Sequence, residues 1–172
     1  MTVDLGPMPT DRRMRTVDER AVRAPWSRVH ALASDVERWP ALLPHYRFVR
    51  FRSRDHAKGG VVEMSAYRPF GILNWPTWWL SEMVVTENTV RFRHIGGITT
   101  GMDVEWTFDP RSDAATFVRI VHVWNGPPVP VIGPMAAYGV IGPVFVHGIA
   151  SRTLAGLAHV AEREAARGGV SA

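Results

Sequence analysis

The sequence predicts an α+β fold in which a curved, seven-stranded antiparallel sheet wraps around a long C-terminal helix. Apolar and polar residues alternate between residues 46 and 125, as they do in strands that face the core on one side and water on the other. Short, turn-like connections divide this region, so neighbouring strands run antiparallel. The last segment changes to helical spacing. Packing the apolar face of the sheet onto that helix buries both surfaces.

Before the alternating region, the chain predicts one strand and one or two short helices. Residues 15–23 are the expected first strand. Pro25 then stands where helices favour proline, in the first turn, and apolar residues follow at helical spacing from Trp26 onward. Pro40 and Pro44 end this helical segment, because the residue before a proline disfavours the helical conformation.

Six further strands make up the antiparallel meander. The alternation is clearest over residues 90–94 and 102–106, where apolar and charged side chains take turns. The expected strands are residues 46–54, 61–68, 77–86, 89–95, 102–108 and 116–124. A proline-rich stretch follows them, and the helix is expected over residues 143–167. Its apolar stripe is formed by Phe145, Ile149, Thr153, Leu157 and Val160.

Length and composition restrict the class of protein. The chain has 172 residues, enough for a single domain, expected over residues 14–172 after a flexible leader at residues 1–13. It has no cysteine, which excludes disulfides, thiolate zinc sites and a cysteine nucleophile. No signal peptide or membrane-spanning helix is visible, so the protein is expected to be cytoplasmic, as a monomer or homodimer. We expect no nucleic-acid partner despite the net charge of +4, because arginine and acidic residues are interspersed.

Three segments resemble a known superfamily. They are Ala24-Pro-Trp-Ser-Arg-Val29, Asp35-Val-Glu-Arg-Trp-Pro40 and the closing Ile141-Gly-Pro-Val-Phe-Val-His-Gly-Ile-Ala-Ser-Arg-Thr-Leu154. From about residue 15 to residue 167 the chain resembles the START-type helix-grip superfamily (SRPBCC), which includes polyketide cyclase/dehydrase-like and coenzyme Q-binding proteins. The resemblance implies a helix-grip fold with a hydrophobic cavity between sheet and helix. It leaves the function open, because carriers, sensors and enzymes share this fold. Residues 73–80 are more aromatic than the typical hairpin of the family.

A register hypothesis places two histidines on the concave face of the sheet. A two-residue hairpin at residues 87–88 pairs Met83 with Phe92, and the following hairpins would align His94, Met102 and His122 in one row. The imidazoles would then lie about 10 Å apart, too far to share a metal ion. On the convex face the same register predicts an ion-pair ladder of Arg91, Glu105 and Arg119.

The expected ligand contacts are the inward-facing side chains of the sheet and one face of the helix. Flat aromatic walls suit polycyclic or quinoid ligands, although the same aromatic residues could simply form core. No cofactor or metal ion is expected, and no nucleophile elbow, zincin motif or P-loop is present. The candidates are Tyr67, Trp79, Ser81, Met83, Phe92, His94, Met102, Trp106, His122, Trp124, Phe145, Ile149 and Thr153.

Apolar loops at one end of the meander predict a cavity rim. Residues 69–76, 96–101 and 126–138 fall at the same end of the sheet and carry apolar side chains, although loops are usually polar. The alternative is that these loops fold inward and close the core. The expected rim consists of Arg68, Phe70, Ile72, Trp75, Ile98, Val131 and Ile132.

Three functions fit these observations. The first is binding and transport of a hydrophobic small molecule such as a polyprenyl quinone, a lipid or a polyketide. The second is a polyketide cyclase/dehydratase-like enzyme in which His94 or His122 is the general acid/base, since histidine titrates near neutral pH. The third is a module that docks onto a membrane transiently, or onto a protein, through its apolar loops.

Overall fold

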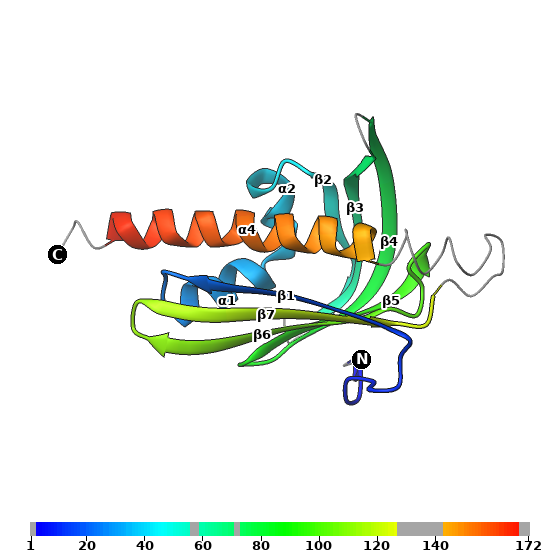
Figure 1. Cartoon of the computed structure of the whole chain (residues 1–172), viewed down its shortest axis with the longest axis horizontal. Coiled ribbons are helices and arrows are strands. Elements are labelled where there is room, and N and C mark those ends of the chain that lie inside the picture. The colour runs from blue at the N-terminus through cyan, green and yellow to red at the C-terminus, as the bar shows by residue number, and fades with distance from the viewer. Residues whose placement is uncertain (1–2, 56–58, 71–72, 127–142, 169–172) are drawn as a thin grey trace.

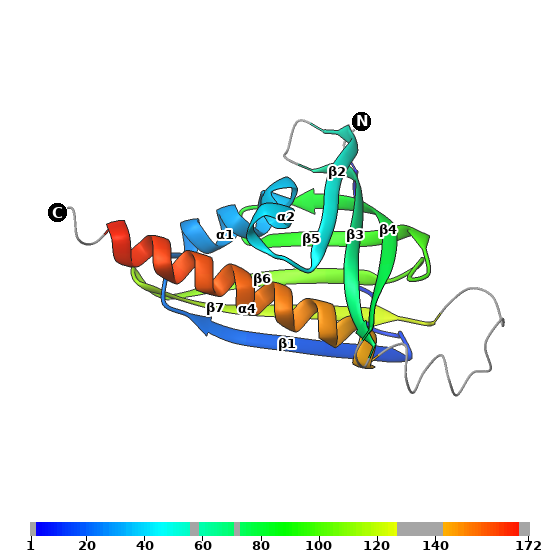
Figure 2. The same ribbon diagram turned by 90° about the horizontal axis from the view of Figure 1, so that it is seen from above.

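The computed structural model describes residues 3–55, 59–70, 73–126 and 143–168, and it confirms the predicted α+β helix-grip architecture. Seven antiparallel strands form one sheet in the order β1-β7-β6-β5-β4-β3-β2, which curves around the long helix α4 (Figures 1 and 2). The strands are β1 (Met14–Val22), β2 (Tyr46–Arg54), β3 (Gly60–Phe70), β4 (Leu73–Val85), β5 (Thr89–Gly97), β6 (Asp103–Ser112) and β7 (Ala115–Trp124). The helices are α1 (Trp26–Ser34), the 3-10 turn η1 (Val36–Arg38), α2 (Trp39–Leu42) and α4 (Pro143–Gly168).

Strand β4 begins four residues before its expected start at residue 77. Pro76 argues against a strand there, because proline cannot donate to a central ladder. Between Leu73 and Trp78, however, β4 pairs with β3 alone, since its pairing with β5 begins where Trp79 meets Gly97. Pro76 therefore lies where β4 is locally an edge strand.

The predicted register is correct for two hairpins and wrong for the third. Met83 stands opposite Phe92, and the His94 N–H donates to the Met102 carbonyl over 2.9 Å. On β6 and β7, however, it is Val104 that stands opposite His122, so the row of His94, Met102 and His122 is wrong by two residues. The physical reason is that β6 continues to Ser112 with an irregularity near its end, where a loop was expected. A shift of two residues keeps each side chain on its predicted face.

The outer face of the sheet carries ion pairs. Arg91 pairs with Glu105 as predicted, at 3.3 Å between Nε and Oε2. Arg119 does not complete the ladder, because the corrected register places it opposite Thr107 and beside Glu19 of β1, with which it pairs at 2.6 Å. The Arg119–Glu19 pair is exposed and contributes little to stability.

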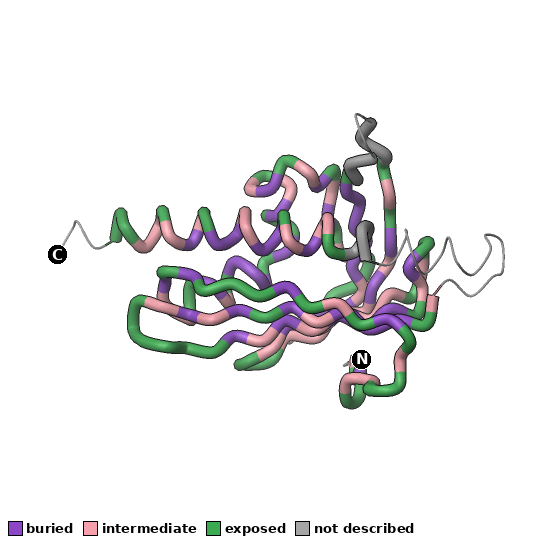
Figure 3. Tube along the Cα trace, viewed as in Figure 1, coloured by how far each residue is buried: buried purple, intermediate pink, exposed green. Residues whose placement is uncertain are grey.

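The apolar core lies between the concave face of the sheet and helix α4. Buried and exposed positions alternate along the strands, as Figure 3 shows. Leu154, Leu157, Ala158 and Ala161 of α4 are each at most 4% exposed and belong to one cluster with the inward strand residues. None of the helices that the structure describes is both long enough and apolar enough to cross a membrane.

Candidate ligand-binding cavity

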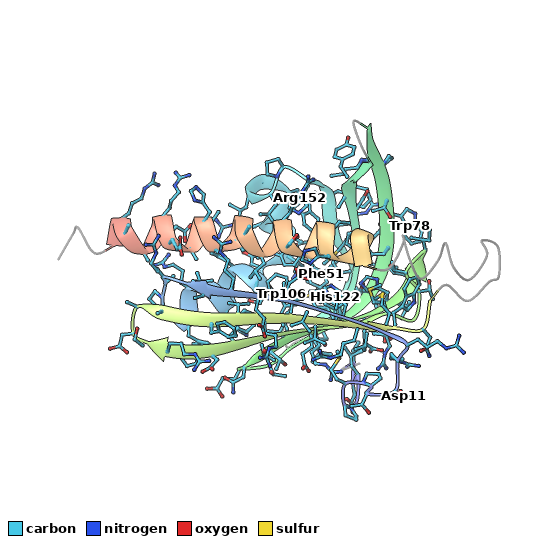
Figure 4. All side chains as sticks on the ribbon, in the orientation of Figure 1. Asp11, Phe51, Trp78, Trp106, His122 and Arg152 are labelled. Carbon is cyan, nitrogen blue, oxygen red and sulfur yellow. The ribbon has the colours of Figure 1, made fainter. Side chains whose placement is uncertain are left out.

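A cavity of about 640 Å³, its open mouth included, lies between the sheet and the N-terminal half of α4. Figure 4 shows Trp106 and His122 between the helix and the sheet. The lining comprises Trp39, Tyr46, Met64, Thr77, Trp79, Phe92, His94, Thr99, Met102, Val104, Trp106, Ile120, His122, Ile149, Ala150 and Thr153.

Most of these side chains face the cavity because side chains alternate between the two faces of a strand. Strand β5 contains one irregularity. Ser81 stands opposite His94 but Leu80 stands opposite Gly96, so Ile95 is an extra residue in β5. Trp79 and His94 both have the inward parity of their strands, and their rings stack on the concave face with centroids 5.9 Å apart. Ile95 is 41% exposed.

Aromatic rings form the wall at the β2 and α2 side. Trp39 contacts the rings of Tyr46 and Trp106 at centroid distances of 5.2 Å and 5.8 Å. Its indole N–H donates to the Leu32 carbonyl over 3.0 Å, which fixes the ring orientation. Tyr46 in turn contacts Trp79 at 6.3 Å. The result is a continuous, rigid surface suited to a flat apolar ligand.

Few polar groups face this apolar surface. His94 Nδ1 lies 2.6 Å from Thr99 Oγ1, whereas His122 Nδ1 is buried and has no hydrogen-bond partner among the described residues. The Thr153 hydroxyl donates to the Ile149 carbonyl over 2.8 Å. It also lies 3.3 Å from the Tyr46 hydroxyl. These groups could fix the orientation of a bound molecule.

Burial keeps the imidazoles uncharged. Burial lowers the pKa of His94 to about 3, and the neighbouring His122 lowers it further. Burial likewise lowers the pKa of His122 to about 3, with a smaller effect from His147. Burial also lowers the pKa of nearby His45 to about 4, helped by the Arg152 charge. At neutral pH His94 and His122 therefore act as neutral hydrogen-bonding groups. Within the described residues no three His, Cys, Asp or Glu side chains gather to hold a metal ion.

The structure brings together most of the candidate residues. Trp79, Phe92, His94, Met102, Trp106, His122, Ile149 and Thr153 all line the cavity. Ser81, Met83 and Trp124 are buried on the same face but outside the lining, and the Trp124 indole donates to the Thr100 carbonyl over 2.9 Å. The side chain of Phe145 lies outside the described part of the structure.

The expectation for Tyr67 is wrong. Met64 and Ala66 of β3 point inward, so Tyr67, with the opposite parity, lies on the outer face. It is 40% exposed there, and the Arg47 guanidinium lies 5.6 Å from its ring centre.

The rim stays a prediction. Ile98, in the turn between β5 and β6, is 43% exposed. Ile72, Val131 and Ile132 lie outside the described residues, as do the side chains of Arg68, Phe70 and Trp75.

Several lining residues were not among the sequence candidates. Met64, Val104 and Ile120 have the inward parity of their strands, so the alternation could have identified them. Trp39 lies far away in sequence from the meander, and Thr99 lies in a turn. Alternation says nothing about such positions. The remaining additions are Tyr46, Thr77 and Ala150.

The fold and the cavity define a helix-grip protein with a hydrophobic cavity between sheet and helix. Residues 22–142 match the family described as polyketide cyclase/dehydrase and lipid transport, and the chain belongs to that family. A comparison with curated proteins finds no match.

Solved structures share this fold at low sequence identity. One is a Thermus thermophilus protein, 22% identical, covering 85% of this chain and 95% of its own, with a TM-score of 0.71. The Zhui aromatase/cyclase from Streptomyces sp. R1128 is 17% identical, with coverage of 87% and 94% and a TM-score of 0.75. A START superfamily protein from Mycobacterium smegmatis is 17% identical, with coverage of 89% and 97% and a TM-score of 0.64. At these identities the likeness concerns the fold.

Proposed function

We propose that this protein binds and carries a flat, hydrophobic small molecule of the polycyclic or quinoid class. The observation that supports the proposal is the cavity itself, whose walls are mainly aromatic and aliphatic side chains. Apolar surface removed from water stabilises a complex by roughly 25 cal/mol per Å². The few polar groups that face the cavity would orient such a ligand.

The family description supports the same class of ligand. It joins polyketide cyclases and dehydrases with lipid transport, and both act on largely hydrophobic molecules. Rigid indole and phenol rings lose little conformational freedom when they contact a planar ligand. The aromatic wall therefore favours a flat ring system over a flexible acyl chain.

The experiment is a titration of menadione, a small naphthoquinone, followed by quenching of tryptophan fluorescence. We expect saturable quenching, with affinity at least tenfold weaker in Trp106→Leu. Trp78→Leu is the matched control, since Trp78 is 49% exposed and does not line the cavity. Non-saturable quenching, or equal loss of affinity in both variants, would contradict the proposal.

A second candidate function is a cyclase/dehydratase that uses His94 or His122 as the general acid/base. The observation in its favour is that both imidazoles line the cavity in their neutral form. A pKa of about 3 makes each a weak base, however, and proton transfer is most effective when the pKa lies near the working pH. This comparison favours binding over catalysis.

The two functions are separated by variants that keep the shape of the cavity. If the protein is a carrier, His94→Gln and His122→Gln change menadione affinity, and a β-hydroxy ketone probe loses no water in any variant. If it is a dehydratase, the wild type dehydrates that probe, and one of the variants abolishes turnover while its affinity stays within a few-fold.

A further inference from the structure

Three buried polar atoms without partners gather on two neighbouring strands beside the cavity. They are Thr16 Oγ1 and Asp18 Oδ2 on β1 and His122 Nδ1 on β7, and none has a hydrogen-bond partner among the residues that the structure describes. Thr16 stands directly opposite His122, and Asp18 stands opposite Ile120. Directly opposed residues of antiparallel strands point to the same face, with Cβ atoms about 5 Å apart. Because His122 and Ile120 line the cavity, Thr16 and Asp18 extend the same concave face by one strand.

The carboxyl group of Asp18 is held by one oxygen only. Asp18 Oδ1 accepts a hydrogen bond from His147 Nδ1 of α4 over 2.6 Å, while Oδ2 has no protein partner within the described ranges. The Asp18 side chain is 3% exposed, and that of His147 is 61% exposed. His147 thus orients the carboxyl group from the solvent side and leaves its second oxygen facing the interior. Burial raises the pKa of Asp18, and His147 partly offsets this effect.

The chemistry of the three atoms favours one kind of occupant. Nearly all buried polar atoms in folded proteins have a hydrogen-bond partner, because leaving one unpaired is destabilising. A ligand hydroxyl group satisfies this set: its hydrogen goes to Asp18 Oδ2, and its oxygen accepts from the Thr16 hydroxyl or the His122 ring. A ligand carboxylate would meet the charge of Asp18, and a bare carbonyl could not donate to it.

We propose that Thr16, Asp18 and His122 form a polar subsite that binds a hydroxyl group, alcoholic or phenolic, of the molecule in the cavity. The subsite rests on the proposed function, because the apolar body of that molecule must occupy the aromatic cavity. It gives the ligand a direction, with its hydroxyl end toward β1 and its rings toward Trp79 and Trp106.

The test compares β-naphthol with naphthalene, measured by equilibrium dialysis. Naphthalene is the more hydrophobic of the two, so a purely apolar cavity would prefer it. We expect the wild type to bind β-naphthol at least tenfold more tightly than naphthalene. In Thr16→Val and in Asp18→Asn this preference should fall to threefold or less, while naphthalene affinity stays within twofold.

Thr107→Val is the matched control, because Thr107 lies on β6 with the outward parity and should leave the preference unchanged. Naphthalene binding also reports whether each variant still folds with an intact cavity. If the wild type binds both probes but shows no preference for β-naphthol, the subsite is overturned and the proposed function stands. If neither probe binds saturably, the proposed function fails, and the subsite fails with it.

Discussion

His122 makes the stability of this protein sensitive to acid. Its side chain is 7% exposed, and burial lowers its pKa from an ordinary value of 6.5 to about 3. Between these two values the unfolded chain binds a proton that the folded chain rejects. The contribution of His122 to the free energy of unfolding is therefore fully present above about pH 6.5 and falls as the pH is lowered toward 3, by up to ~1.4 kcal/mol per pH unit.

We expect His122→Leu to make this acid sensitivity smaller. Urea unfolding measured at intervals from pH 7 to pH 4 should lose roughly 1 kcal/mol less per pH unit in the variant than in the wild type. His94, whose pKa is lowered in the same way, retains its own contribution. His159→Gln removes an exposed imidazole from α4 and serves as the control. Parallel pH profiles for wild type and His122→Leu would contradict the buried, neutral state of this histidine.

Two arginines on the outer face of the sheet form ion pairs that differ in burial, so substituting each one measures how burial changes the contribution of an ion pair to stability. Arg93 Nε donates to Asp103 over 2.8 Å, and the Asp103 side chain is only 2% exposed. Arg119 pairs with Glu19 where the two side chains are 50% and 42% exposed. We expect Arg93→Met to lower the free energy of unfolding by roughly 2–4 kcal/mol, because it leaves a buried carboxylate unpaired. Arg119→Met should cost less than about 1 kcal/mol. Equal losses in denaturant titrations would contradict this ranking.

At the scale of elements, helix α4 packs so closely on Leu43, the residue that follows α2, that a side chain at Gly156 requires Leu43 to move. A Cβ atom on Gly156 would overlap Cδ2 of Leu43, which is 1% exposed and has little room to move. A Cβ atom on Gly148 meets nothing within 4 Å among the described residues. We expect Gly156→Ala to lower the free energy of unfolding by about 1–3 kcal/mol through overpacking. Gly148→Ala should raise it by about 0.5–1 kcal/mol, since glycine weakens a helix interior. Stabilisation by both variants, measured by chemical denaturation, would show that α4 and α2 are loosely packed.

The face of the sheet on which a strand residue lies can be predicted from its neighbours in the sequence. The face on which a strand residue lies follows from alternation, which predicts Phe92, His94 and Trp106 on the concave face, where they line the cavity. Tyr67 has the outward parity of β3, so its aromatic character alone predicts the wrong face.

Register and tertiary partners depend on irregularities that a single sequence does not mark. The extra residue Ile95 in β5 and the extension of β6 to Ser112 each change the pairing of neighbouring strands. In the same way, Trp39 reaches the cavity only because α2 packs against β2 and α4. The fold class could therefore be predicted in full, whereas the site could be predicted only for residues within the meander and on the apolar stripe of the C-terminal helix.

On the scale of the whole molecule, the two halves of α4 have different tasks. Ile149, Ala150 and Thr153 cover the cavity, whereas Leu157, Ala158 and Ala161, further along the helix, are part of the closed core. The core half supplies the apolar burial that holds the helix on the sheet. The half of α4 that covers the cavity can therefore leave the space beside it unfilled. A binding site of this kind sacrifices some stability, since filling it with side chains would bury more apolar surface.

This division of α4 predicts opposite results for the same substitution at two positions. Ala150 lines the cavity at 6% exposure, and Ala158 lies in the core at 1% exposure. We expect Ala150→Leu to raise the free energy of unfolding by roughly 0.5–1.5 kcal/mol, because the new side chain fills empty space, and to weaken menadione binding at least tenfold. Ala158→Leu should instead lower the free energy of unfolding by about 1–3 kcal/mol, since it overpacks a filled region, and leave the affinity of the folded protein within a few-fold. Urea unfolding and fluorescence titration measure both quantities. Destabilisation by Ala150→Leu together with unchanged menadione affinity would show that the space beside this residue does not receive the ligand.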